Sequence, residues 1–138
     1  MLVSPGTQQA SETDGADGRG WPRILAGPPV ASLEEYLQRG GGSALTRALE
    51  LGSVATIAEV SAAGLRGRGG AGFPAGRKWD SILNGGGRHH YAVCNAAEGE
   101  PGTFKDRAVM RHNPYAVLEG LLVAAHSVGA LEASIGLK

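Results

Sequence analysis

The sequence predicts an α/β fold built around a strand–helix–strand unit with parallel strands. Residues 91–95 (YAVCN) form a short apolar run typical of a buried strand, and residues 133–137 (ASIGL) have the pattern of a second strand. Between them, Asn113 and Pro114 are suited to begin a helix, as N-cap and first helical residue. A strand, a helix and a second strand at this spacing favour a right-handed crossover and a parallel sheet.

Composition and charge exclude several classes of protein. The 138 residues carry 13 Lys and Arg against 13 Asp and Glu, which disfavours a nucleic-acid or anionic-membrane binder that depends on bulk charge. The single cysteine, Cys94, excludes an internal disulfide framework, a usual four-ligand zinc site and an iron–sulfur cluster held by this chain alone. No apolar run approaches the roughly 18 residues of a membrane helix, and no secretory signal is recognised. We therefore expect an intracellular, soluble protein.

The first 63 residues are expected to form a tail and a helical segment. Residues 1–20 are small, polar and acidic, and we predict that they are disordered. Residues 21–30 contain three prolines and are expected to be extended. Three short helices should follow, the first begun by a capping box of Ser32 and Glu35. Glycine is placed to end each helix, at Gly40, Gly52 and Gly64.

Glycines concentrate in the segment before the first strand. Residues 67–72 fit the pattern G-x-G-x-x-G, but a helix precedes them and no acidic residue follows at the distance of the dinucleotide fingerprint. A P-loop is also excluded, because Lys78 comes one place late and Trp79 stands where Ser or Thr should bind magnesium. Neither standard nucleotide-binding motif is present.

The chemistry of this glycine loop still favours an anion. Glycine lets backbone N–H groups surround a ligand closely, and four cations flank the loop. Lys78 is expected to open the next helix, where the helix dipole also favours a phosphate. A flexible surface loop and an RNA-contacting Arg-Gly segment are the alternatives. The four cations are Arg66, Arg68, Arg77 and Lys78.

A second candidate segment, the acidic turn of residues 95–102 (NAAEGEPG), is expected at the carboxyl end of the first strand. Ligands bind there in open parallel sheets. Glycine and proline flank Glu98 and Glu100 and should hold the backbone in a defined turn. The two carboxylates could accept hydrogen bonds from ribose hydroxyls or an amide, and the alternative is a solvated acidic turn. Four charged residues after it are expected on a helix face with local ion pairs: Lys105, Asp106, Arg107 and Arg111.

Histidine and cysteine give weaker signals. His89 and His90 have no partner at metal-ligand spacing and are expected at the surface. Cys94 lies inside the first predicted strand and is expected to fill the core rather than to act as a nucleophile. We assign no residue as catalytic and none as a metal ligand.

Three motifs taken together resemble one family. They are GLRGRGGAGFPAGRKW at residues 64–79, CNAAEGEPGTFKDR at 94–107 and MRHNPYAVLEG at 110–120. They closely resemble the FMN-binding, NADH-oxidising flavin subunit of NADH–quinone oxidoreductase, which is respiratory complex I. The resemblance covers about residues 23–138. Diaphorase subunits of NAD-linked formate dehydrogenases and hydrogenases share the motifs, so they remain an alternative.

The resemblance implies an architecture and a chemistry. Residues 64–138 would be the N-terminal part of an FMN-binding α/β domain, after a helical segment of residues 21–63. In this family, hydride passes from the nicotinamide of NADH to noncovalently bound FMN, and electrons then leave singly to iron–sulfur centres. The cofactor-binding residues implied by position are Gly67, Arg68, Gly69, Gly70, Ala71, Gly72, Phe73, Pro74, Ala75, Gly76, Lys78, Asn95, Glu98 and Glu100.

Within this set, the resemblance implies separate roles. The glycine loop would lie against the dinucleotide, Lys78 would reach the FMN phosphate, and Phe73 would offer a stacking surface beside the nicotinamide. Asn95 would contact the flavin. Glu98 and Glu100 would hold polar groups of flavin and NADH.

The resemblance also implies partners. These are a thioredoxin-like [2Fe–2S] subunit and an iron–sulfur subunit. Through these partners the chain would be cytoplasmic and peripheral to the membrane, without direct insertion, and it would bind no nucleic acid.

Family members continue with a ubiquitin-like domain and a helical domain whose cysteines hold a [4Fe–4S] cluster, so we expect a truncated chain without the cluster ligands. Ala97 stands where complex I members usually have Asp, which indicates a divergent branch. A non-catalytic fragment that binds nucleotide or partner subunits is the remaining alternative.

Overall fold

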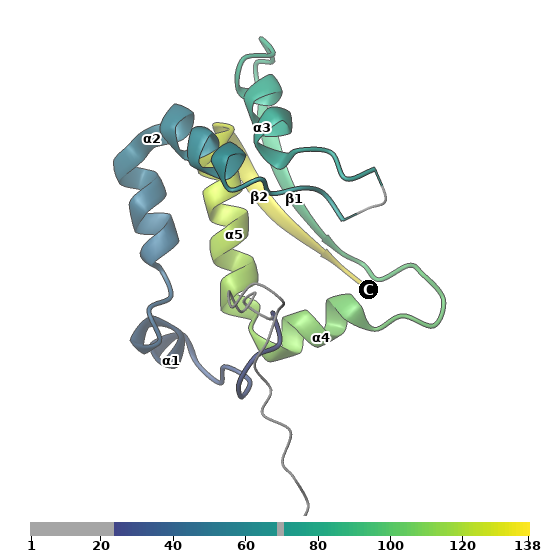
Figure 1. The fold of residues 1–138 in the computed structure, drawn as a ribbon. Helices are drawn as coiled ribbons and strands as arrows, with labels where there is room; N and C mark the ends of the chain where they lie inside the picture. The colour runs from purple at the N-terminus through teal and green to yellow at the C-terminus, as the bar shows by residue number, and fades with distance from the viewer. Residues whose placement is uncertain (1–23, 69–70) are drawn as a thin grey trace, which may run out of the picture.

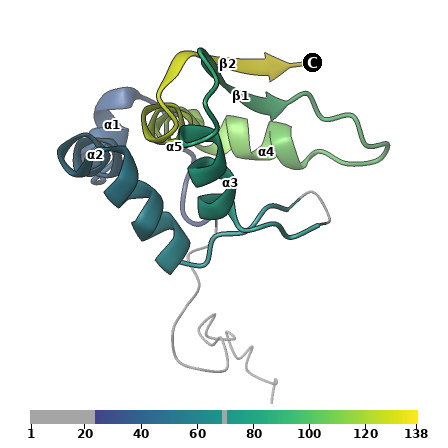
Figure 2. The same cartoon turned by 90° about the horizontal axis from the view of Figure 1, so that it is seen from above.

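The computed structural model describes residues 24–68 and 71–138, so the tail predicted for residues 1–20 lies outside the described residues. Figure 2 shows the three helices α3, α4 and α5 on the same side of the two strands. The elements in chain order are α1 (Leu33–Gln38), α2 (Ser43–Ala62), α3 (Ala75–Leu83), β1 (His90–Ala96), α4 (Lys105–His112), α5 (Pro114–Ser127) and β2 (Ala130–Leu137).

The two strands confirm the predicted parallel unit. β1 and β2 pair in parallel, with Ala92 opposite Ala133 and Cys94 opposite Ile135. The helix α5 lies between them in the chain and begins as expected, because the Asn113 side chain accepts a hydrogen bond from the third residue of the helix at 3.0 Å. β2 begins at Ala130, three residues before its predicted start, because the helix ends at Ser127 and leaves only a short turn.

The first strand is less buried than predicted. Tyr91 and Val93 are 62% and 69% exposed, whereas Ala92, Cys94 and Ala96 on the opposite face are half-buried or buried. The helix α5 packs on β1 and covers one face only. The prediction of a buried strand was therefore wrong for the face that carries Tyr91 and Val93, and Cys94 lies half-buried on the covered face.

The helix α1 begins where the capping box was predicted. The Glu35 N–H donates to the Ser32 hydroxyl at 3.1 Å. The Glu35 carboxylate accepts from the N–H of Ala31 at 2.8 Å, one residue before the position of an ideal capping box. Gly40 follows the helix with a φ of 90°, a left-handed conformation that favours glycine.

The long helix α2 is interrupted at Gly52, where the backbone leaves the helical region with φ 75° and ψ 173°. The second and third helices predicted from the sequence are therefore the two halves of α2, and they meet at Gly52 as expected. Thr56 is buried, and its hydroxyl donates to the Gly52 carbonyl at 2.8 Å, which satisfies a polar group at the kink. The helix α2 packs on the strand–helix–strand unit through its contact with α5. The predicted domain boundary between residues 63 and 64 stays a prediction.

The N-terminus of α2 is capped by a carboxylate from α5. Its own N-cap residue is Gly42, which has no side chain to accept a hydrogen bond. The Glu119 carboxylate accepts from the N–H of Gly42 and from the N–H of Leu45, both at 2.9 Å. The Tyr36 hydroxyl donates to the same carboxylate, and the Tyr36 ring stacks on Tyr115 with centroids 5.8 Å apart. One side chain of α5 thus joins α1 and α2.

These contacts shift two pKa values. Desolvation acts to raise the pKa of Glu119, but hydrogen bonds from Tyr36 and from the backbone at the start of α2 outweigh it and hold that pKa below 4.5. Burial, together with the hydrogen bond to Glu119 and its charge, raises the pKa of Tyr36 to about 12. Both shifts favour the ionised carboxylate beside a neutral phenol.

We predict that Glu119→Gln lowers the free energy of unfolding near pH 7 by about 2 kcal/mol, because a charged cap is lost. The folded-state pKa lies below the unfolded value, so the carboxylate contributes stability above about pH 4.5 that is lost as the pH falls through the lower folded-state pKa. Urea unfolding from about pH 7 to about pH 3 measures both effects. Glu50→Gln, at an exposed position on α2, is the control. If the free energy of unfolding of Glu119→Gln fell as steeply with decreasing pH as that of the wild type, the role of Glu119 as a charged cap would be contradicted.

Candidate functional site

The glycine-rich segment forms a loop that is closed at its base, here called the glycine hairpin (residues 64–75; Figure 1). The Gly67 N–H donates to the Phe73 carbonyl at 2.9 Å, and the Ala75 N–H donates to the Leu65 carbonyl at 2.8 Å. These two bonds hold the two ends of the loop together across its base. The base is therefore a fixed structure rather than an open surface loop.

The cations around the hairpin have different positions. The Arg66 guanidinium donates to the Gly72 carbonyl at 3.0 Å and so braces the loop from within. Arg77 and Lys78 are exposed on the first residues of α3. The predicted contacts at residues 69–70 lie outside the described residues. Lys78, to which the resemblance assigns the FMN phosphate, therefore has an accessible side chain.

The helix α3 begins earlier than predicted, at Ala75 rather than at Lys78, with Pro74 as its N-cap. Gly76 is buried against α2, where a Cβ atom would lie 2.0 Å from the Ser61 hydroxyl and 2.9 Å from the Ser61 backbone nitrogen. Helix packing therefore requires a glycine at this position. The predicted glycine loop, which extended to Gly76, ends inside the first turn of a helix.

The acidic turn has the defined backbone that the sequence predicts. The Asn95 side chain accepts from the N–H of Ala97 at 3.1 Å and turns the chain at the end of β1. The Glu100 carbonyl accepts from the N–H and the hydroxyl of Thr103 at 3.3 and 2.9 Å. Gly102, inside this second turn, has a φ of 76°.

The two carboxylates of the acidic turn have different surroundings. The Glu98 side chain is 6% exposed, and it accepts from the N–H of Asp106 at 3.1 Å and from Nε of Arg107 at 2.9 Å. The Glu100 side chain is 72% exposed and pairs with Nζ of Lys105 at 3.1 Å. The ion pairs predicted along the face of α4 therefore mainly reach across to the acidic turn.

These contacts also shift two pKa values. Desolvation acts to raise the pKa of Glu98, but the hydrogen bonds from Arg107 and from the backbone of Asp106 hold that pKa below its ordinary value. The hydrogen bond to Glu100 raises the pKa of Lys105 above its ordinary value. Both acids of the turn are thus matched by cations of α4.

Exposure divides the predicted site residues into three groups. Most of the loop and turn side chains are exposed, as a ligand contact requires, whereas Gly76 is buried. The exposed members are Gly67, Arg68, Ala71, Phe73, Lys78, Asn95 and Glu100, and the half-buried members are Gly72, Pro74, Ala75 and Glu98. Both views show the glycine hairpin and the acidic turn on the same side of the molecule, at the carboxyl end of β1 (Figures 1 and 2).

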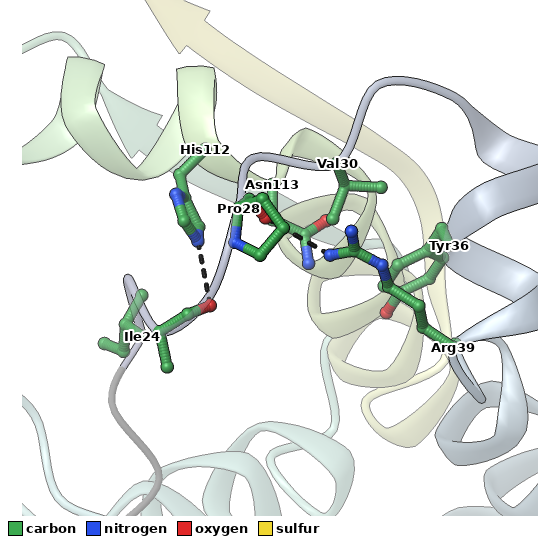
Figure 3. Close-up of a pocket in the computed structure, with 9 residues that line it drawn as sticks. Ile24, Pro28, Val30, Tyr36, Arg39, His112 and Asn113 are labelled. Carbon is green, nitrogen blue, oxygen red and sulfur yellow. Dashed lines mark hydrogen bonds between the residues drawn. The ribbon is translucent and has the colours of Figure 1, made fainter.

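A pocket of about 230 Å³ lies elsewhere, between the segment before α1 and the junction of α4 and α5 (Figure 3). Its polar groups pair with one another: the Arg39 guanidinium donates to the Pro28 carbonyl, and Nε2 of His112 lies by the Ala26 carbonyl, both at 3.2 Å. Sequence reasoning gave His112 no role. The residues that line the pocket come from positions 24–41 and 112–113, so the pocket lies where the N-terminal segment meets the helices.

The two adjacent histidines differ in burial. His89 is exposed, as expected, but His90 is half-buried with Nδ1 2.6 Å from the Val128 carbonyl, so the surface role predicted for it was wrong. Across residues 24–68 and 71–138, no group of three or more His, Cys, Asp or Glu side chains is placed to hold a metal ion. In the same described ranges, no helix combines the length and the apolar character that crossing a bilayer requires.

A parallel strand–helix–strand unit with a polar turn at the carboxyl end of its first strand defines an α/β domain of the class that binds ligands at this end of the strands. Comparison with known families gives a specific assignment within this class. Residues 60–138 match the model of the Nuo51 FMN-binding domain. The chain belongs to this family, which confirms the resemblance and the fold class predicted from the sequence.

Individual relatives agree with this assignment. The chain is 46% identical over 112 residues to the F subunit of NADH-quinone oxidoreductase from Aquifex aeolicus, covering 80% of this chain and 26% of the relative. It is 49% identical over 105 residues to an F subunit of NADH-quinone oxidoreductase from Rhizobium meliloti, covering 75% and 24%. The chain thus spans about a quarter of the length of these curated relatives.

Solved structures give a second comparison. A chain of the NAD+-reducing [NiFe]-hydrogenase in the H2-reduced state matches with a TM-score of 0.65 and 36% identity. The match covers 79% of this chain and 19% of the hydrogenase chain. The likeness supports the same fold.

We predict that Gly76→Ala lowers the free energy of unfolding by about 2 kcal/mol, because the added Cβ would collide with Ser61 and separate α2 from α3. Gly120→Ala is the matched control, since Gly120 lies on α5 with open space around it. That substitution should leave stability unchanged or raise it by up to about 1 kcal/mol. Equal stability of the two variants in urea unfolding would show that the α2–α3 contact is not tight.

Proposed function

We propose that this chain forms the N-terminal part of the FMN- and NADH-binding domain in the flavin subunit of an NADH–quinone oxidoreductase. The family match over residues 60–138 carries this proposal, because it contains both the glycine hairpin and the acidic turn. The relatives at 46–49% identity are named as F subunits of that oxidoreductase. The activity is therefore transfer of hydride from NADH to a bound flavin, with onward electron transfer to quinone.

The described residues fit an FMN phosphate. The helix α3 begins at the end of the glycine hairpin, and Lys78 is exposed on its first turns. A helix N-terminus and an ammonium group both favour a phosphate. When bound, FMN supplies the hydride-accepting and one-electron chemistry, which amino-acid side chains lack. The task of this chain is to hold the phosphate and to orient the ring.

Other residues suit the ring systems. Phe73 is 52% exposed at the base of the glycine hairpin, so its ring is available for stacking beside the nicotinamide. Asn95 is exposed at the end of β1, and we assign it to contact with the flavin. Glu100 is the more exposed carboxylate of the acidic turn, and we assign it to polar groups of NADH. No residue of this chain acts as a general base in the proposal.

The proposal includes partners. Electrons would leave to iron–sulfur centres in other subunits, a thioredoxin-like [2Fe–2S] subunit and an iron–sulfur subunit. Those subunits would place the chain at the cytoplasmic face of the membrane. The alternative is a diaphorase subunit of an NAD-linked hydrogenase or formate dehydrogenase, and the observation behind it is the 36% identity to a chain of the NAD+-reducing hydrogenase, which is lower than the 46–49% identity to the F subunits. Quinone reduction by the complex supports the first function, whereas reduction of viologen but not quinone supports the second.

We predict that the whole flavin subunit binds FMN and that Lys78→Ala raises the dissociation constant of FMN about tenfold, because one charge-assisted hydrogen bond to the phosphate is lost. Titration of FMN, followed by flavin fluorescence, measures both values. Arg47→Ala, which removes an exposed cation from α2, is the control. A whole flavin subunit that binds no FMN would contradict the proposed function, and equal affinity in Lys78→Ala would remove only the role of this lysine.

We predict that Glu100→Gln raises the KM for NADH about tenfold with a smaller effect on kcat, because a carboxylate acceptor for NADH is lost. Steady-state kinetics of the whole flavin subunit with an artificial electron acceptor measure the two constants. Glu132→Gln on β2, also at an exposed position, is the control. An unchanged KM would assign Glu100 to the solvated surface.

A further inference from the structure

The N-terminus of α4 is held by the acidic turn rather than by its own N-cap residue. Among the described residues, the Phe104 side chain makes no capping hydrogen bond. The Glu98 carboxylate takes this place: one oxygen accepts from the N–H of Asp106 at 3.1 Å and the other from Nε of Arg107 at 2.9 Å. A carboxylate at this end of a helix also has a favourable interaction with the helix dipole.

The contact between Glu98 and Arg107 differs from an ordinary surface ion pair. The Glu98 side chain is 6% exposed, although that of Arg107 is 62% exposed. A nearly buried carboxylate needs a cation or several donors, because burial alone favours its neutral form. The neighbouring pair of Lys105 and Glu100 is 57% and 72% exposed, so solvent screens it and it contributes little.

The position of Glu98 in the chain makes this contact important for the site. Glu98 lies three residues after Asn95 and two residues before Glu100, which are the exposed polar residues of the acidic turn. Fixing the carboxylate in the middle of the turn therefore fixes the backbone on both sides of it. The planar guanidinium of Arg107 supplies a directional donor, which an ammonium group does not.

We propose that Arg107 is a positioning residue, which holds the Glu98 carboxylate against α4 and thereby sets where the acidic turn presents Asn95 and Glu100 to the flavin and to NADH. This inference rests on the proposed function. Arg107 itself touches no ligand in it. The role assigned from the resemblance to Glu98, contact with flavin or NADH, is replaced by anchorage of the turn.

The test compares Arg107→Ala, Arg107→Lys and the control Arg111→Ala, which removes another exposed cation of α4. In the whole flavin subunit, Arg107→Ala should raise the FMN dissociation constant and the KM for NADH about tenfold each, with kcat less affected. Arg107→Lys should recover part of the loss, and Arg111→Ala should match the wild type. Hydrogen exchange at the Asp106 amide, the partner of Glu98, should become faster in Arg107→Ala.

A double-mutant cycle with Glu98→Gln makes the test specific. The effects of Arg107→Ala and Glu98→Gln on the FMN dissociation constant should be non-additive, because each change breaks the same contact. Additive effects, or a lower thermal midpoint with unchanged FMN affinity and KM, would overturn the inference and leave Arg107 a purely structural residue. If the wild-type protein binds no FMN, the proposed function fails and the positioning role fails with it. If only the variants are unaffected, this inference alone fails.

Discussion

The carboxylate of Glu119 at the N-terminus of α2 is the contact on which the arrangement of the helices depends. It joins the crossover helix α5 to α2 through two backbone N–H groups and to α1 through the Tyr36 hydroxyl. The other end of α2 meets α3 through the close approach of Ser61 and Gly76. A continuous path of contacts therefore leads from the sheet, through α5 and α2, to the helix that carries Lys78.

The same physical solution occurs twice. The N-cap residue of α2 is Gly42 and that of α4 is Phe104, and each helix is capped instead by a glutamate distant from it in the chain or across a turn. Hydrogen bonds hold the pKa of both glutamates below the ordinary value, in spite of desolvation. In each case the cap also fixes a second element: α1 for Glu119 and the acidic turn for Glu98.

Local signals in the sequence predicted much of this structure. The caps at Ser32 and Asn113, the break at Gly52 and the parallel strands depend on residues close together in the chain, and all were confirmed. The glycine hairpin and the acidic turn were found because glycine permits backbone conformations that other residues avoid and proline fixes φ, so both residues mark turns locally. Features that depend on distant contacts could not be predicted. The role of Glu119 requires α2, 74 residues or more away, and the glycine at position 76 is explained only by Ser61 on another helix. For the same reason the sequence offered no basis for assigning different surroundings to Glu98 and Glu100. In the structure, α4 covers the Glu98 side chain and leaves the Glu100 side chain in solvent.

The closed base of the glycine hairpin separates changes at the exposed positions of the loop from the stability of the fold. Backbone bonds from Gly67 and Ala75 and the brace from Arg66 all lie at or beside the base. Side-chain changes at Arg68 and Ala71, which are exposed and take no part in these bonds, should therefore leave the helices and the strands in place. The sequence can vary at these two positions with little cost to folding, whereas the base tolerates only residues that keep the same backbone bonds.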